Sequence, residues 1–126
     1  MKFYRNPTKR VSASTIKIRL HHGFGGGKLA GGKALSMQRM LWTNDCDVVM
    51  MGHTHITSVQ TEAIGYVDRS GRECEKPKLG LWTGNWMGRA RYADNHGYMP
   101  LPVGYAKLII EPYREGLGKL IGQAIV

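Results

Sequence analysis

The sequence predicts a layered α+β domain, and the order of its hydrophobic segments is the main reason. Strand-like segments at 15–20 and 47–51 flank a segment rich in helix formers, which is the order of two parallel strands joined by a helix. Further strand-like segments follow with short turns between them, as in the antiparallel part of a mixed sheet. The chain has 126 residues, of which 42% are hydrophobic and 21% charged, so we expect one globular domain and exclude a disordered or fibrous protein.

A local pattern predicts each element. Residues 15–20 alternate polar and apolar side chains, which is the period of a strand with one buried face. The glycine-rich stretch 23–32 predicts a loop, and the helix formers at 34–42 predict a short helix with one apolar side. The apolar run at 47–51 predicts a strand buried on both faces, and 68–71 predicts a hairpin turn. Three more strands are expected, at 56–67, 79–83 and 105–110.

The positive charge is concentrated in the first third of the chain. The net charge is +9, and residues 1–44 contain nine Lys or Arg and no Asp or Glu. Residues 1–14 are therefore expected to form a basic N-terminal arm. Clustered positive charge attracts phosphates, which favours a phosphorylated substrate or a nucleic acid as partner. The alternative is a basic face that only keeps the protein soluble.

No segment approaches the ~20 apolar residues of a membrane-spanning helix, and residues 1–15 lack the apolar stretch of a signal peptide. We therefore expect a cytoplasmic protein with no membrane contact. The two cysteines, Cys46 and Cys74, form no Cys-x-x-Cys pair, so both are expected to be reduced.

Four of the five histidines fall in two clusters, each directly after a predicted strand. His21 and His22 follow the first strand, and His53 and His55 follow the second. Neutral imidazole is a common ligand for transition metals, so this clustering predicts a metal site. In an extended backbone, the spacing of two residues would place the rings of His53 and His55 on the same side. The alternative is that these histidines are hydrogen-bonding polar residues at strand ends.

These residues also resemble a known family. The stretch 16–56, with His-His-Gly after one strand and Gly-His-Thr-His after the next, resembles the calcineurin-like metallophosphoesterases. The resemblance implies a β-sandwich flanked by helices, and a hydrolase in which two divalent ions (Mn, Fe or Zn) activate a hydroxide that attacks a phosphomonoester, a phosphodiester or a nucleic acid. It implies that His21 and His53 bind one metal and His55 the other. His22 would then contact the substrate or support a ligand, which makes it the candidate catalytic residue.

The chain also departs from this family. The Asp-x-His, Gly-Asp and Gly-Asn-His motifs that precede the two matching motifs are absent, and no Asp or Glu occurs before Asp45. Residues 1–126 therefore look like a single partial domain, the carboxyl-terminal half of such an enzyme. We expect either a partner chain that supplies the amino-terminal half or a homo-oligomer.

The candidate phosphate-binding residues lie in the glycine-rich loop and in a later segment that combines aromatic and basic residues. Residues 82–92 interleave tryptophan and tyrosine with arginine, which suits the binding of bases and phosphates. This pattern favours an alternative function, a non-catalytic basic module that binds nucleic acid. Trp82 in that segment could equally be a core residue. The phosphate-binding candidates are Lys28, Lys33, Arg89 and Arg91.

Overall fold

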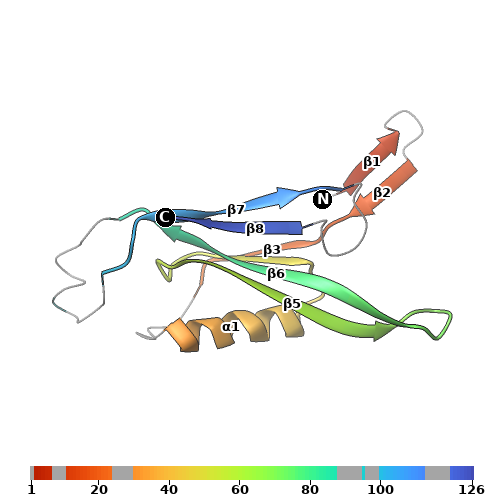
Figure 1. Cartoon of the computed structure of the whole chain (residues 1–126), viewed down its shortest axis with the longest axis horizontal. Helices are drawn as coiled ribbons and strands as arrows, with labels where there is room; N and C mark the ends of the chain where they lie inside the picture. The colour runs from red at the N-terminus through yellow and green to blue at the C-terminus, as the bar shows by residue number, and fades with distance from the viewer. Residues whose placement is uncertain (1, 7–10, 24–29, 88–94, 96–99, 113–119) are drawn as a thin grey trace.

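A computed structural model describes residues 2–6, 11–23, 30–87, 95, 100–112 and 120–126, and shows a mixed α+β architecture (Figure 1). Within these residues, one helix and one six-stranded mixed sheet make up most of the fold. The elements are β1 (Lys2–Asn6), β2 (Val11–Thr15), β3 (Ile18–His21), α1 (Ala30–Thr43), β4 (Val48–Met51), β5 (Thr57–Val67), β6 (Glu73–Asn85), β7 (Gly104–Ile110) and β8 (Leu120–Ile125).

The sheet is parallel where the histidine motifs occur. Strands β3, β4 and β6 run in the same direction, with His21 opposite Met51 and Met51 opposite Trp82. Strand β5 pairs antiparallel with β6, β7 pairs with the last residues of β6, and β8 pairs with β7. The carboxyl ends of β3 and β4 therefore lie side by side at one edge, next to the final residues of β6.

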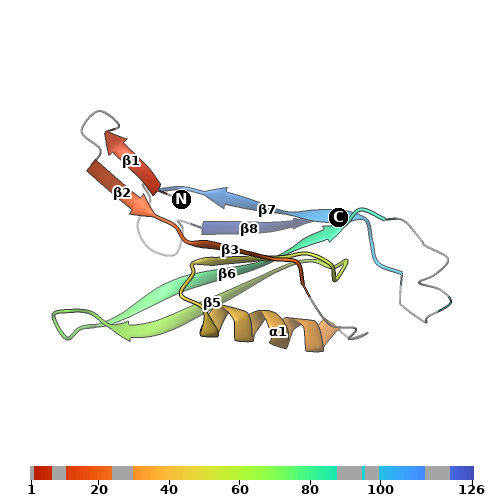
Figure 2. The same cartoon turned by 180° about the vertical axis from the view of Figure 1, so that it is seen from behind.

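Two hydrophobic cores lie on opposite faces of the sheet. Helix α1 covers one face of the part of the sheet formed by β3, β4, β5 and β6. The β7–β8 pair lies over the opposite face of that part, as the front and back views show (Figures 1 and 2). Val49 and Met51 of β4 pack toward α1, whereas Val48 belongs to the core beneath β7 and β8. Both faces of β4 are therefore covered, as its continuous apolar sequence predicted.

Helix α1 packs very close to β6. A Cβ atom on Gly80 would lie 2.5 Å from Met37 Cγ, so only glycine allows this approach. The helix begins at Ala30, four residues earlier than predicted, although Gly31 and Gly32 follow at once. Burial of Met37 and Leu41 compensates for the low helix propensity of the two glycines.

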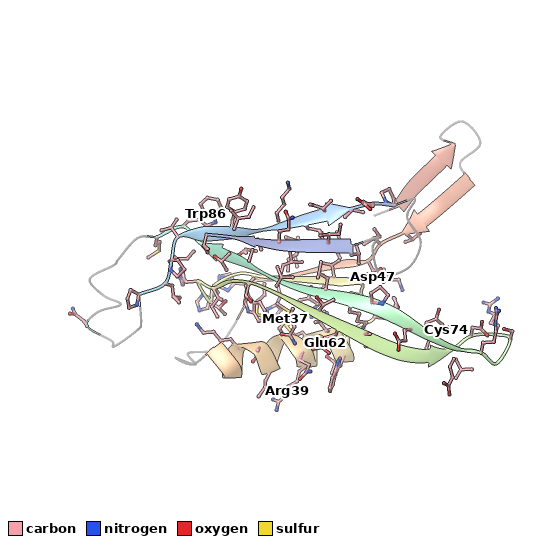
Figure 3. The ribbon with its side chains drawn as sticks, in the orientation of Figure 1. Met37, Arg39, Asp47, Glu62, Cys74 and Trp86 are labelled. Carbon is pink, nitrogen blue, oxygen red and sulfur yellow. The ribbon has the colours of Figure 1, made fainter. Side chains whose placement is uncertain are left out.

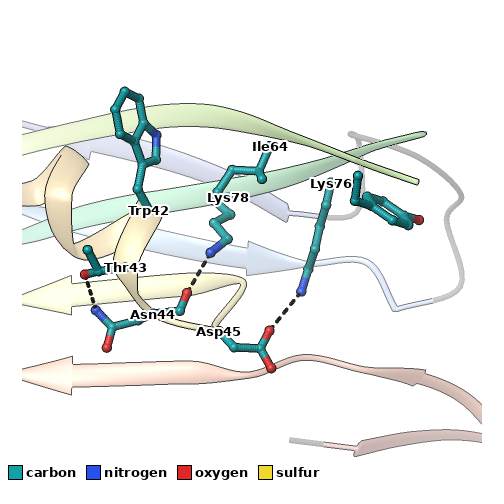
Figure 4. Close-up of a pocket in the computed structure, with 8 residues that line it drawn as sticks. Trp42, Thr43, Asn44, Asp45, Ile64, Lys76 and Lys78 are labelled. Carbon is teal, nitrogen blue, oxygen red and sulfur yellow. Dashed lines mark hydrogen bonds and ion pairs between the residues drawn. The ribbon is translucent and has the colours of Figure 1, made fainter. Parts of the chain in front are cut away.

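A buried lysine holds the carboxyl end of α1. Lys78 is only 5% exposed, and its Nζ donates hydrogen bonds of 2.6 Å to the carbonyls of Leu41 and Asn44. Figure 4 shows the bond to Asn44. The lysine thus satisfies carbonyls that the helix leaves unpaired. A pocket of about 290 Å³ lies beside it, between the end of the helix and strands β5 and β6.

Several predicted elements are confirmed with shifted bounds. The strand predicted at 15–20 is interrupted, because Asp47 Oδ2 accepts a hydrogen bond of 2.7 Å from the Lys17 backbone N–H and separates β2 from β3. The strand predicted at 79–83 begins at Glu73, since β5 extends its pairing. Residues 1–14, expected to form a basic arm, contain β1 and β2, which pair with each other. No helix within the described segments is long and apolar enough to cross a membrane.

Candidate metal centre

The two histidine motifs meet at the carboxyl edge of the parallel strands. The N–H of Gly52 donates a hydrogen bond of 3.1 Å to the carbonyl of His21, which ties the end of β4 to the end of β3. Thr83 of strand β6 also lies at this edge, next to Gly52. A Cβ atom on Gly52 would lie 3.5 Å from Thr83 Oγ1. Three segments that are distant in sequence are therefore neighbours at this edge.

Gly23 locks the two motifs together. Its φ is +98°, a conformation that favours glycine, and a Cβ atom there would lie 2.3 Å from the Gly52 carbonyl oxygen. The same atom would lie 3.0 Å from His53 Cβ. Any larger residue at position 23 would therefore push the second motif away from the first.

His53 and His55 have strained backbones. Their φ angles are +63° and +54°, and they are the non-glycine residues with positive φ in the part of the chain that the structure describes. The Thr54 N–H donates a hydrogen bond of 2.7 Å to the Gly52 carbonyl, which closes a tight turn centred on His53. The prediction that residues 52–55 are extended is therefore wrong. Such strain is characteristic of functional sites.

The assignment of His21, His53 and His55 as metal ligands stays a prediction, and the structure shows which imidazole rings lie together. The rings of His22 and His53 lie side by side, with centroids 4.8 Å apart and planes inclined by 42°. His21 instead accepts a hydrogen bond of 2.9 Å at Nδ1 from the Gly23 N–H. A metal-binding histidine usually donates a hydrogen bond from its second ring nitrogen, so this arrangement favours His22 over His21 as the neighbour of His53 at a metal.

Carboxylates lie at the opposite end of the sheet. Asp45 and Asp47 precede β4, whereas the histidines lie at or beyond the carboxyl ends of β3 and β4. Asp47 Oδ1 lies 2.9 Å from Lys76 Nζ, and this hydrogen bond raises the pKa of Lys76. A hydrogen bond from Lys17 lowers the pKa of Asp45. Both aspartates are therefore engaged in ion pairs far from the histidine edge.

The donors present fit part of a metal site. Within the described ranges, no group of three or more His, Cys, Asp or Glu side chains is placed to hold a metal ion. A stable transition-metal site in a protein has three or four ligands, and the neighbouring imidazoles of His22 and His53 could supply two of them. A metal ion bound at this edge would therefore need further ligands from residues outside this pair.

A lysine and an unpaired hydroxyl accompany the second motif. Lys33 Nζ donates a hydrogen bond of 3.1 Å to the Thr54 carbonyl, and burial lowers the pKa of Lys33. The hydroxyl of Thr54 is buried and has no hydrogen-bond partner among the residues that can be described. Of the four phosphate-binding candidates, Lys33 therefore lies at this edge. Lys28, Arg89 and Arg91 lie outside the described residues.

The aromatic residues near this edge have different environments. Trp82 is 3% exposed and belongs to the core beneath α1, so the interpretation of Trp82 as a core residue is confirmed. Trp86 is 73% exposed and stacks on Tyr105, with ring centroids 5.8 Å apart and planes inclined by 11°. Sequence reasoning missed Thr83 and Tyr105, because their position depends on pairing between distant strands.

Comparisons of the chain with protein-family models, curated proteins and solved structures found no match. The histidine edge nevertheless combines a strained turn, two adjacent imidazoles and a lysine amine. This combination can bind a cation and an anion next to each other.

Proposed function

We propose that the chain is the carboxyl-terminal half of a metallophosphoesterase-like domain and contributes ligands to a centre that hydrolyses phosphoesters. The observation that carries the proposal is the strained turn at His53, which Gly23 holds against the first histidine motif. A turn of this kind costs free energy. Its presence at the carboxyl end of parallel strands, where binding sites are usually built, therefore supports a functional role for the turn.

Each residue at the edge has a distinct role in this proposal. His22 and His53 would hold one cation, and His55 would hold a second. His21 accepts the hydrogen bond of the Gly23 N–H and thereby positions the turn. Divalent ions bound there (Mn, Fe or Zn) would supply Lewis-acid polarisation of the phosphoryl group and a nucleophilic water at neutral pH. The Lys33 amine, next to the Thr54 carbonyl, is available to attract the phosphate.

The missing ligands are expected from a second polypeptide segment at β3. Among the described strands, β3 lies at the end of the sheet and pairs with β4 alone. Leu20 on this strand is 75% exposed. An edge strand of this kind can accept another strand, and if that strand pairs in parallel, as β4 does, its carboxyl end would lie beside His21 and His22. A partner chain or a second copy of this chain would therefore bring carboxylates to the centre.

Hydrolysis of bis-p-nitrophenyl phosphate with added Mn²⁺ tests the proposal, with bound metal measured in the same samples. Three proteins are compared: the wild type, His53→Ala, and His96→Ala as a matched histidine outside both motifs. We expect metal binding that His53→Ala abolishes and His96→Ala retains, with turnover in the wild type alone or after addition of a partner. The proposal fails if metal binding is absent or independent of His53. Salt-sensitive nucleic-acid binding that survives both chelation and His53→Ala would then support the non-catalytic module.

A further inference from the structure

The exposed aromatic pair next to the histidine edge has the character of a binding surface. Trp86 and Tyr105 stack almost in parallel, yet they are 73% and 41% exposed. Leaving two large aromatic rings in water forgoes the stabilisation that burial would give. The local structure holds them there, because the buried Asn85 side chain donates to the Leu101 carbonyl (3.2 Å) and accepts from the Met87 N–H (3.1 Å).

Polar residues continue this surface along the outer face of β7 and β8. Ala106 and Leu108 of β7 point into the core, so Tyr105 and Lys107 share the opposite, solvent-facing side. Gln123 of β8 is also exposed and pairs with Lys107 across the strands. The surface therefore presents aromatic rings, then an ammonium group and an amide about 7 Å farther along, as the rise of a strand requires.

This aromatic surface, defined by Trp86, Tyr105, Lys107 and Gln123, lies at the same end of the molecule as the histidines. Trp86 follows β6, whose Thr83 is adjacent to Gly52 of the second motif. Figure 3 shows Trp86 at the end where β6 finishes and α1 begins. A ligand that occupies both places would extend across the carboxyl edge of the sheet.

We propose that the aromatic surface stacks a nucleobase, so that the substrate class of the proposed centre is single-stranded nucleic acid. The inference rests on the proposed function for the position of the scissile phosphodiester, but base binding itself does not depend on hydrolysis. Aromatic platforms beside lysines are the means by which proteins bind single strands, whereas the bases of a duplex are already stacked on one another. The net charge of +9 adds attraction for a polyanion. A second copy of this chain would carry the same positive charge, which disfavours it as the occupant.

Fluorescence anisotropy of a labelled dT12 oligonucleotide, measured with EDTA at fixed salt, tests the proposal. Trp86→Ala should raise the Kd about 5- to 150-fold, which is the usual effect of losing one stacked base. Trp86→Phe should retain most of the affinity. Trp42→Ala is the matched control, because Trp42 is also exposed (58%) but lies at the far end of α1, and its Kd should change less than about twofold. Circular dichroism confirms that each variant is folded.

The outcomes separate this inference from the proposed function. His53→Ala should abolish metal-dependent hydrolysis of bis-p-nitrophenyl phosphate without weakening dT12 binding in EDTA. Weaker binding by Trp86→Ala with no hydrolysis by any protein would support the surface while contradicting the proposed function. Equal Kd values for Trp86→Ala and Trp42→Ala would overturn the inference, even if His53-dependent hydrolysis is present. Absence of dT12 binding, with self-association that Trp86→Ala abolishes in sedimentation, would assign the surface to a contact between copies and also overturn it.

Discussion

Replacement of Gly23 by alanine tests how firmly the two histidine motifs are locked together. The first cost is conformational, because alanine at φ +98° loses about 1–2 kcal/mol. The second cost is steric, since the new Cβ would lie 2.3 Å from the Gly52 carbonyl oxygen, where an ordinary contact is 3.4–4 Å. The two segments therefore have to separate by about 1 Å, which costs about 1–3 kcal/mol as overpacking.

Separation of the segments also weakens the hydrogen bond between the Gly52 N–H and the His21 carbonyl, which contributes about 1 kcal/mol. The three costs together predict that Gly23→Ala lowers the free energy of unfolding by about 3–6 kcal/mol. Gly71→Ala is the matched control. Its φ is also positive, at +80°, but nothing lies within 4 Å of its added Cβ, so it should lose only the conformational cost of about 1–2 kcal/mol.

Urea unfolding followed by circular dichroism measures both variants. The reasoning predicts a clearly larger loss for Gly23→Ala, with an unchanged dependence on urea concentration for both. Equal losses in the two variants would refute it, because they would show that the contact between Gly23 and Gly52 imposes no constraint.

Three further predictions concern the scaffold. Lys78→Met should lower the free energy of unfolding by about 2–4 kcal/mol, because it leaves the Leu41 and Asn44 carbonyls unpaired. Lys107 is exposed, so Lys107→Met should change the free energy of unfolding little. Urea titration compares the two variants, and equal effects would contradict the role of Lys78 as a helix cap. Hydrogen bonds, chiefly from the Ser70 hydroxyl, lower the pKa of Asp68 below its ordinary 3.8, so its stabilisation is complete above that pH and is lost as pH falls through the folded-state pKa. Unfolding measured from pH 6 downward should show a weaker acid dependence in Asp68→Asn than in the wild type, and identical profiles would exclude this contribution. Gly32→Ala should stabilise the chain by about 0.5–1 kcal/mol, because its Cβ meets no atom within 4 Å; a lower melting temperature would show that the glycine is needed in the first turn of α1.

The parts of the fold that depend on local pattern could be predicted. The apolar run 47–51 indicated a strand covered on both faces, and the structure confirms this, with α1 on one side and the β7–β8 pair on the other. The placement of histidines at the ends of two strands was also predictable, since the apolar residues end there: His21 is the last residue of β3, and β4 ends at Met51 before His53. These features depend on residues close together in the sequence.

Features that depend on distant contacts could not be predicted. Trp82 and Trp86 are four residues apart on an aromatic-rich segment, yet one is buried and the other exposed, because β6 leaves its pairing with β4 at Trp82 and pairs with β7 at Gly84 and Asn85. The His21 ring accepts a hydrogen bond from the Gly23 N–H. The direction of that N–H depends on the positive φ of Gly23, which the sequence does not reveal. The left-handed turn at His53 could not be predicted for the same reason.

Histidine ring proton NMR with substoichiometric Mn²⁺ tests most directly whether the histidine edge contributes to a metal centre. Ring signals are assigned with single histidine variants, and paramagnetic broadening then identifies the rings nearest the ion. The account predicts that the signals of His22 and His53 broaden at the lowest Mn²⁺ concentration and that Gly23→Ala reduces this effect by separating the two motifs. Equal broadening of all five histidines, or none, would contradict it.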